Sequence, residues 1–153
     1  MREENEIKII ISRSEILNEV AKVTDYVGSL KVEADEEARD RILADDETLS
    51  DWSRFFDDAF VMLTDGWREM VRGYTCDLEQ MILLLEVNSG FDREHIPAVK
   101  SSIESFLINA IVGMWFGISN PDESEVYLKK GADFLDRGSR LLYGRRGPVV
   151  PKR

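Results

Sequence analysis

The most regular stretch of this chain, residues 49–74, reads LSDWSRFFDDAFVMLTDGWREMVRGY. Apolar side chains recur there every three or four residues, at Leu49, Trp52, Phe56, Ala59, Phe60, Leu63, Trp67, Met70, Val71 and Tyr74. This spacing is typical of the apolar face of an amphipathic helix, with charged side chains on the other faces. The stretch therefore predicts one helix of about 25 residues that ends at Gly73 and whose tryptophans pack in the core.

Other helices are predicted on both sides of this stretch. Ser12 and Glu15 have the spacing of a capping box, and the apolar pattern that follows ends at Gly28. The remaining helical patterns are a short acidic one over 36–44, one that starts at Asp92 or Ile96, and one that begins at Pro121 and is closed by Gly144. Beyond Phe106 the pattern that precedes Pro121 is apolar on nearly every face, which predicts a helix enclosed by this fold or by an oligomer.

A small β element is predicted from two short apolar runs. Residues 7–11 read IKIII, and residues 78–87 contain the run MILLL at 81–85. In a strand, side chains 81, 83, 85 and 87 would share one face. Because Leu and Glu also permit a helix, the second run is a strand only if it finds a partner, which could be 7–11 or a strand of a neighbouring subunit.

These patterns predict a mainly α fold, a bundle of about four to five helices with a β element at 7–11 and 78–87. Residues 1–144 form a single helical domain with an N-terminal arm, since a chain of 153 residues is long enough for one core. The last nine residues, 145–153, form an extended basic tail with the sequence RRGPVVPKR. Two prolines and a glycine oppose a helix there.

Composition excludes several classes of protein. The net charge of −10 argues against a basic nucleic-acid footprint over the whole domain. One cysteine, Cys76, and one histidine, His95, exclude an internal disulfide and the usual His-based catalytic sites. No secretory signal is seen, and the apolar run 106–118 is too short to span a bilayer, so synthesis in a cytosol is expected.

The charge is unevenly distributed along the chain. From Arg137 onward there are six basic residues and no acidic one, whereas residues 1–136 hold 14 basic and 30 acidic residues. One interpretation is a solvated acidic surface with a loose tail. The other is an interaction arm, and its candidate partner-binding residues are Arg145, Arg146, Val149, Val150, Lys152 and Arg153. The apolar centre of the tail favours a protein groove over a phosphate backbone.

No catalytic residue set, cofactor site or metal site is predicted. A helical di-metal site would need Glu-x-x-His motifs, and none occurs. Helical nucleotide pyrophosphohydrolases bind magnesium through Glu-x-x-Glu pairs. A similar spacing occurs here on a short helix with a solvated character, at Glu33, Glu36, Glu37 and Asp40. His95 is expected to cap a helix or lie on the surface, and Cys76 is expected to be a plain buried thiol.

Two segments carry a resemblance to a known class of proteins. They are IIISRSEILNEVAKVT at 9–24, and SSIESF at 101–106 followed by VGMWF at 112–116 and the helix at 121–143 that ends in LYGRR. They resemble small proteins of phages and prophages of Bacteroides-type gut bacteria. The order of helices, β element and extended tail is similar to that of head–tail connector (adaptor) proteins of tailed phages.

The resemblance implies a structural virion protein that is not an enzyme. Such subunits form a ring, commonly twelve-fold, beneath the portal protein and insert their C-terminal tails into the portal. The ring also contacts adjacent tail and neck proteins, and DNA passes through its lumen. A strongly acidic wall suits such a conduit, because it repels the duplex. Two alternatives stay open: a magnesium-dependent helical nucleotide hydrolase, and a small acidic regulator or DNA mimic that binds a basic partner.

Overall fold

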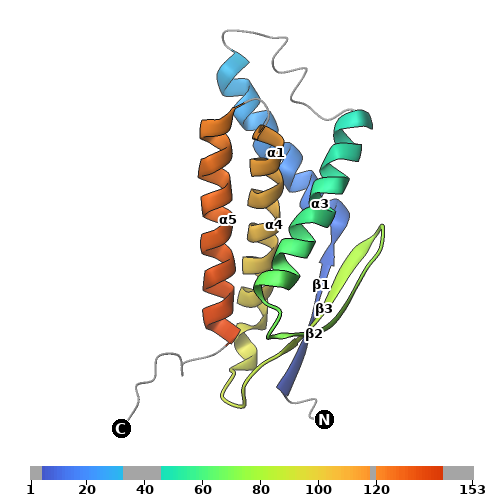
Figure 1. Ribbon diagram of the computed structural model, residues 1–153, viewed down its shortest axis with the longest axis vertical. Helices are drawn as coiled ribbons and strands as arrows, with labels where there is room; N and C mark the ends of the chain where they lie inside the picture. Colours follow the sequence, from blue (N-terminus) through green and yellow to red (C-terminus); the bar gives the residue numbers. More distant parts are fainter. Residues whose placement is uncertain (1–4, 33–45, 118–119, 143–153) are drawn as a thin grey trace.

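The computed structural model describes residues 5–32, 46–117 and 120–142, and it describes no side chains at 25–32 and 46–49. Within these ranges the chain forms four α-helices and a three-stranded antiparallel sheet, with the helices on one side of the sheet (Figure 1). The mainly helical fold with a small β element is confirmed. The predicted acidic helix at 36–44 and the predicted tail at 145–153 lie outside the described residues.

The sheet is built from β1 (Glu6–Ser12), β2 (Val71–Cys76) and β3 (Gln80–Glu86) in the order β1-β3-β2. The run 78–87 is thus a strand from residue 80 onward, and it pairs with 7–11 of the same chain, with Ile9 opposite Leu83. Strand β1 therefore satisfies the backbone of β3 without help from another subunit.

The two strands predicted from sequence alternate as expected for a half-covered sheet. Their inward side chains are all at most 2% exposed: Ile7, Ile9, Ile11, Met81, Leu83 and Leu85. Their outward neighbours Ile10, Ile82 and Leu84 are exposed or half-buried. The period of two in the sequence thus predicts correctly which residues face the helices.

The four helices are α1 (Arg13–Val32), α3 (Asp46–Gly66), α4 (Ile96–Phe116) and α5 (Pro121–Leu142). Ser12 caps α1 by accepting a hydrogen bond from the backbone N–H of Glu15 at 3.3 Å. Asn120 caps α5 in the same way at the N–H of Glu123, also at 3.3 Å. The prediction that α1 ends at Gly28 is wrong, because the helix continues to Val32.

The predicted long helix over 49–74 is wrong over its last eight residues, 67–74. Helix α3 ends at Gly66, a turn follows in which the N–H of Met70 donates to the carbonyl of Trp67 at 2.7 Å, and β2 begins at Val71. The apolar spacing of the last residues fits a helix equally well, so local pattern cannot decide their state. Pairing with β3 decides it, since Tyr74 lies opposite Leu83 in the sheet.

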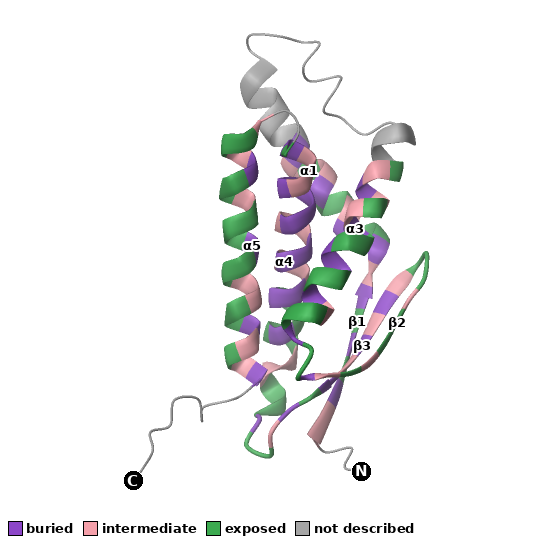
Figure 2. Cartoon of the chain, viewed as in Figure 1, coloured by how far each residue is buried: buried purple, intermediate pink, exposed green. Residues whose placement is uncertain are grey.

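Helix α4 is the centre of the molecule. From Ser102 to Phe116 none of its residues is exposed, while α5 presents exposed side chains along its outer side (Figure 2). The prediction of an enclosed helix is confirmed, and the enclosure comes from α5, α3, α1 and β1 of the same chain. Trp52 and Trp67 are buried in this core, and Trp115 lies edge-on to Trp52 with ring centroids 5.6 Å apart.

Candidate functional site

The partner-binding residues predicted from sequence all follow the last described helix. All six lie outside the described residues: Arg145, Arg146, Val149, Val150, Lys152 and Arg153. The helix that precedes them ends at Leu142, which is 1% exposed and lies beside Met70, Val87 and Asn88. The N–H of Val87 donates to the carbonyl of Asn5 at 2.8 Å, so α5 ends near the start of β1, at one end of the molecule (Figure 1).

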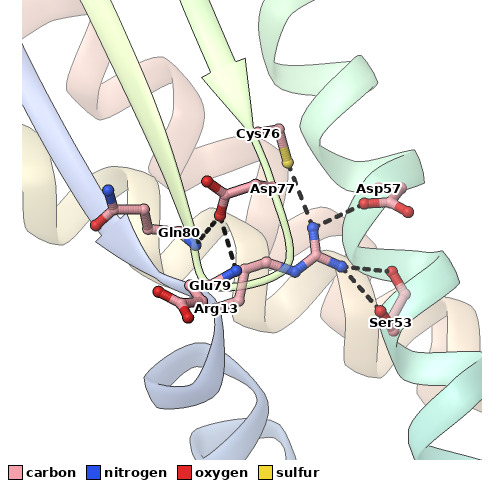
Figure 3. Close-up of polar contacts among 7 residues, drawn as sticks. All are labelled: Arg13, Ser53, Asp57, Cys76, Asp77, Glu79 and Gln80. Atoms are coloured by element: carbon pink, nitrogen blue, oxygen red, sulfur yellow. Dashed lines mark hydrogen bonds and ion pairs between the residues drawn. The ribbon is translucent and has the colours of Figure 1, made fainter.

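One polar cluster joins three parts of the fold, and we call it the Arg13 junction: Arg13, Ser53, Asp57 and Cys76 (Figure 3). Arg13 follows the last residue of β1 and begins α1, and it is 4% exposed. Its guanidinium donates to Asp57 Oδ1 at 2.8 Å, Ser53 Oγ at 2.8 Å and Cys76 Sγ at 3.3 Å. The guanidinium also lies over the ring of Phe56, 4.3 Å from its centroid.

The tight turn between β2 and β3 holds the junction from the other side. Asp77 Oδ1 accepts hydrogen bonds from the N–H groups of Glu79 at 2.8 Å and Gln80 at 2.9 Å, and these bonds lower the pKa of Asp77. The N–H of Arg13 donates to the carbonyl of Glu79 at 3.0 Å. The start of α1, helix α3 and the β2–β3 turn are therefore tied together by one arginine.

The chemistry of the junction is that of a structural clamp. Burial raises the pKa of the Cys76 thiol, and the nearby Arg13 guanidinium offsets this only in part. A thiol with a raised pKa is mostly protonated at neutral pH and is a weak nucleophile. Cys76 differs from the plain buried thiol expected from sequence, because its Sγ accepts a hydrogen bond from Arg13. The local sequence does not reveal this basic partner, since it lies 63 residues away in the chain.

A second feature is an open groove on the flank of the molecule, lined by Glu15, Ile16, Asn18, Glu19, Lys22, Glu104 and Ile108. We call it the α1–α4 groove, and its volume is about 480 Å³. Lys22 pairs with Glu19 at 3.1 Å, with both side chains at least half exposed. Neither Glu15 nor Glu104 forms an ion pair within the described ranges, which leaves an excess of negative charge in the groove.

Burial affects Glu104 most among the carboxylates of the groove. Partial desolvation raises its pKa above the ordinary value of 4.5, Lys100 offsets part of this, and the charge of Glu15 adds to it. In the sequence Glu104 is the single charged residue between Lys100 and Asp122. That isolation in an apolar helix marks Glu104 as unusual, but it does not reveal the groove beside it, and nothing local indicates the partners of Arg13.

The remaining candidates have no chemical site around them in the described part of the chain. There, no group of three or more Asp, Glu, His or Cys side chains could hold a metal ion. The four acidic residues on which a magnesium-dependent hydrolase would depend lie outside the described residues: Glu33, Glu36, Glu37 and Asp40. His95 is the N-cap residue of α4, in line with the expected position, but its side chain makes no capping hydrogen bond. Its ring is half-buried and lies edge-on to Phe91.

Comparisons with known proteins identify no relative of this chain. No protein-family model, curated protein or solved structure matches the chain. Of the helices that the structure describes, none combines the length and apolar character needed to cross a membrane.

Proposed function

We propose that this protein is a structural virion protein, the subunit of a head–tail connector or neck ring of a tailed phage that infects Bacteroides-type gut bacteria. Copies of the chain form a ring, commonly twelve-fold in such connectors, and the ring docks on the portal protein and on adjacent neck proteins. DNA passes through the lumen without sequence-specific binding. The subunit is made in the cytoplasm of the host bacterium and takes no cofactor.

The observation that carries this proposal is the position on the body at which the last described helix ends. Helix α5 ends at buried Leu142 beside Val87, at the end of the molecule where β1 also starts. The residues after Leu142 thus start from one end of a closely packed body, and a docking arm requires such a starting point. The tail carries Arg145, Arg146, Lys152 and Arg153 and no acidic residue.

The acidic body fits the same role. The chain holds 30 acidic and 20 basic residues, and six of the basic ones follow Asp136. A body with excess negative charge repels the phosphates of DNA, which lets a duplex slide through a lumen without binding to its wall. The polar side chains of the Arg13 junction are hydrogen-bonded to one another, which fits a cluster that holds the body together.

The test is deletion of residues 145–153 from the full chain. The truncated protein should keep its helicity and melting temperature, because the deletion removes no residue of the described core. It should lose incorporation into particles and co-sedimentation with the portal ring of the phage that encodes it. A matched control carries the full-length tail with Val149→Ala and Val150→Ala, which keeps all four basic charges and should retain part of the binding.

Negative-stain microscopy of the purified full-length protein, alone and with portal, tests the ring itself. Closed rings that stack on portal are the expected result. The proposal is overturned if the protein stays monomeric with portal, or if the truncated chain assembles as well as the full-length chain. A monomer that hydrolyses nucleotides with Mg²⁺, or that binds a DNA-binding protein at low salt, would favour one of the two alternatives.

A further inference from the structure

The α1–α4 groove combines an apolar base with an acidic rim. Ile16 and Ile108 line it from the two helices, and two carboxylates of its lining, Glu15 and Glu104, form no ion pair among the described residues. Glu15 and Glu19 are four residues apart on α1, so both point to the same side of that helix, about 6 Å apart along its axis. The groove therefore offers two carboxylates on its α1 wall, a third on its α4 wall, and aliphatic surface from both helices.

The C-terminal tail has the complementary pattern. Val149 and Val150 form an apolar centre, with Arg146 three residues before it and Lys152 two residues after it. In an extended chain these separations are about 10 Å and 7 Å. Two valines can thus cover the isoleucines while basic side chains on both sides reach the carboxylates of the rim. Pro148 and Pro151 favour the extended conformation before binding, which lowers the entropic cost of docking.

We propose that the α1–α4 groove is the docking site for residues 145–153 of a neighbouring copy of this chain. Eleven residues follow Leu142, and an extended segment of that length reaches about 35 Å. Leu142 lies at one end of the molecule beside Val87 and Asn88, whereas the groove lies on the flank. The tail can therefore leave its own molecule and reach the flank of the next one.

This arrangement rests on the proposed ring, and it gives the ring a specific contact. Each copy carries one tail and one groove, so the contact is head-to-tail, and repeated head-to-tail contacts close into a ring when the rotation permits. The tail would then link each subunit to the next, and the ring built from these contacts would dock on portal. The charges of the groove would select the neighbouring tail, because the rest of the chain is predominantly acidic.

The experiment uses the full-length chain with Val150 replaced by the photoreactive residue p-benzoyl-phenylalanine. Copies labelled with ¹⁵N and unlabelled copies are mixed in equal amounts, irradiated and digested, and the crosslinked peptides are identified by mass spectrometry. We expect crosslinks to peptides that contain Glu15–Lys22 or Glu104–Ile108, with labelled and unlabelled peptides joined to each other. Such mixed pairs arise only between two molecules.

Groove variants test whether the carboxylates recruit the tail. In a chain that carries Glu15→Gln, Glu19→Gln and Glu104→Gln, half-maximal crosslinking should need about tenfold more protein, since partly exposed ion pairs each contribute modestly. The matched control carries three changes at exposed glutamates outside the groove, Glu79→Gln, Glu94→Gln and Glu125→Gln. It loses the same total charge and should crosslink like the parent.

Two results would overturn the inference. Crosslinks that join only like-labelled peptides would place the tail on its own molecule, and crosslinks to other segments would place it elsewhere. The proposed function can fail separately: groove crosslinks between copies that neither form rings nor bind portal contradict the connector role. Rings that bind portal without groove crosslinks contradict this docking site alone.

Discussion

On its α5 side, helix α4 meets its neighbour through glycines, whereas on its α1 side a glutamate and an isoleucine border an open groove. A Cβ atom at position 138 of α5 would lie 3.1 Å from Cβ of Ser102 in α4 and 2.9 Å from Cη2 of Trp67, and one at position 113 of α4 would lie 2.7 Å from Cγ of Leu128 in α5. Only hydrogen fits at these two positions without movement of the neighbours. On the other side, Glu104 and Ile108 stay half-buried and border a volume of about 480 Å³.

The difference between the two sides of α4 indicates that one side of a helix can stabilise the fold while the other side is free to bind a partner. Close contact through glycine removes water from large apolar surfaces, and changes there cost stability. The carboxylates of an open groove contribute little to folding, so they can be replaced without loss of the fold. The four predictions below test this contrast, in order of decreasing effect.

The largest effect is expected at the closed side. Trp67→Ala should lower the free energy of unfolding by about 3–5 kcal/mol, because the indole is 3% exposed and its removal leaves a large cavity. Urea unfolding measures the loss, with Val61→Ala as a control at a side chain that is 61% exposed. A loss under about 1 kcal/mol for Trp67→Ala would mean that this side of the core is not closely packed.

The second effect is expected at the Arg13 junction, which anchors the first turn of α1 and so one wall of the groove. Arg13→Met should cost about 1.5–3 kcal/mol, because hydrogen bonds to a buried guanidinium are lost while its apolar stem is kept. Arg68→Met removes a pair whose side chains are 75% and 73% exposed and should cost under about 0.5 kcal/mol. Equal losses in the two variants would contradict a structural role for the junction.

The third effect is expected at Gly138. Gly138→Ala should destabilise the protein by about 1–2 kcal/mol, since the new methyl group would also lie 3.1 Å from Cβ of Ser102 and two helices must separate. The gain in helix propensity of about 1 kcal/mol offsets part of this cost. Gly66→Ala, whose Cβ would lie 3.4 Å from Leu135, is the control and should be neutral or stabilising in thermal melts.

The smallest effect is expected at Glu104, on the open side. Its folded-state pKa is raised, so the folded state holds the proton more tightly, and stability falls as pH rises from 4.5 through the raised pKa. Glu104→Gln should therefore be more stable than the parent at pH 8 by under about 1 kcal/mol, and the difference should shrink at pH 4. Unfolding in urea at both pH values measures it, with the exposed Glu125→Gln as the control. A variant less stable at pH 8 would show that the carboxylate stabilises the closed core.

Much of the fold follows from local sequence. The period of two in IKIII and MILLL determined which side chains of β1 and β3 face the helices, and the caps at Ser12 and Asn120 determined where α1 and α5 begin. The continuous apolar character of α4 determined that it lies at the centre. These features are local because the side-chain directions of a strand or helix repeat within a few residues.

Tertiary structure decided the rest. Residues 71–76 fit either a helix or a strand by their spacing, and only hydrogen bonding to β3 made them β2. Arg13 meets Cys76 across 63 residues of sequence, and Glu104 meets the first turns of α1, because the packing of α1, α3 and the sheet brings distant segments together. Sequence periodicity reports which face of an element is apolar, but it carries no information on which element covers that face. The junction and the groove therefore became visible only when the elements were packed against one another.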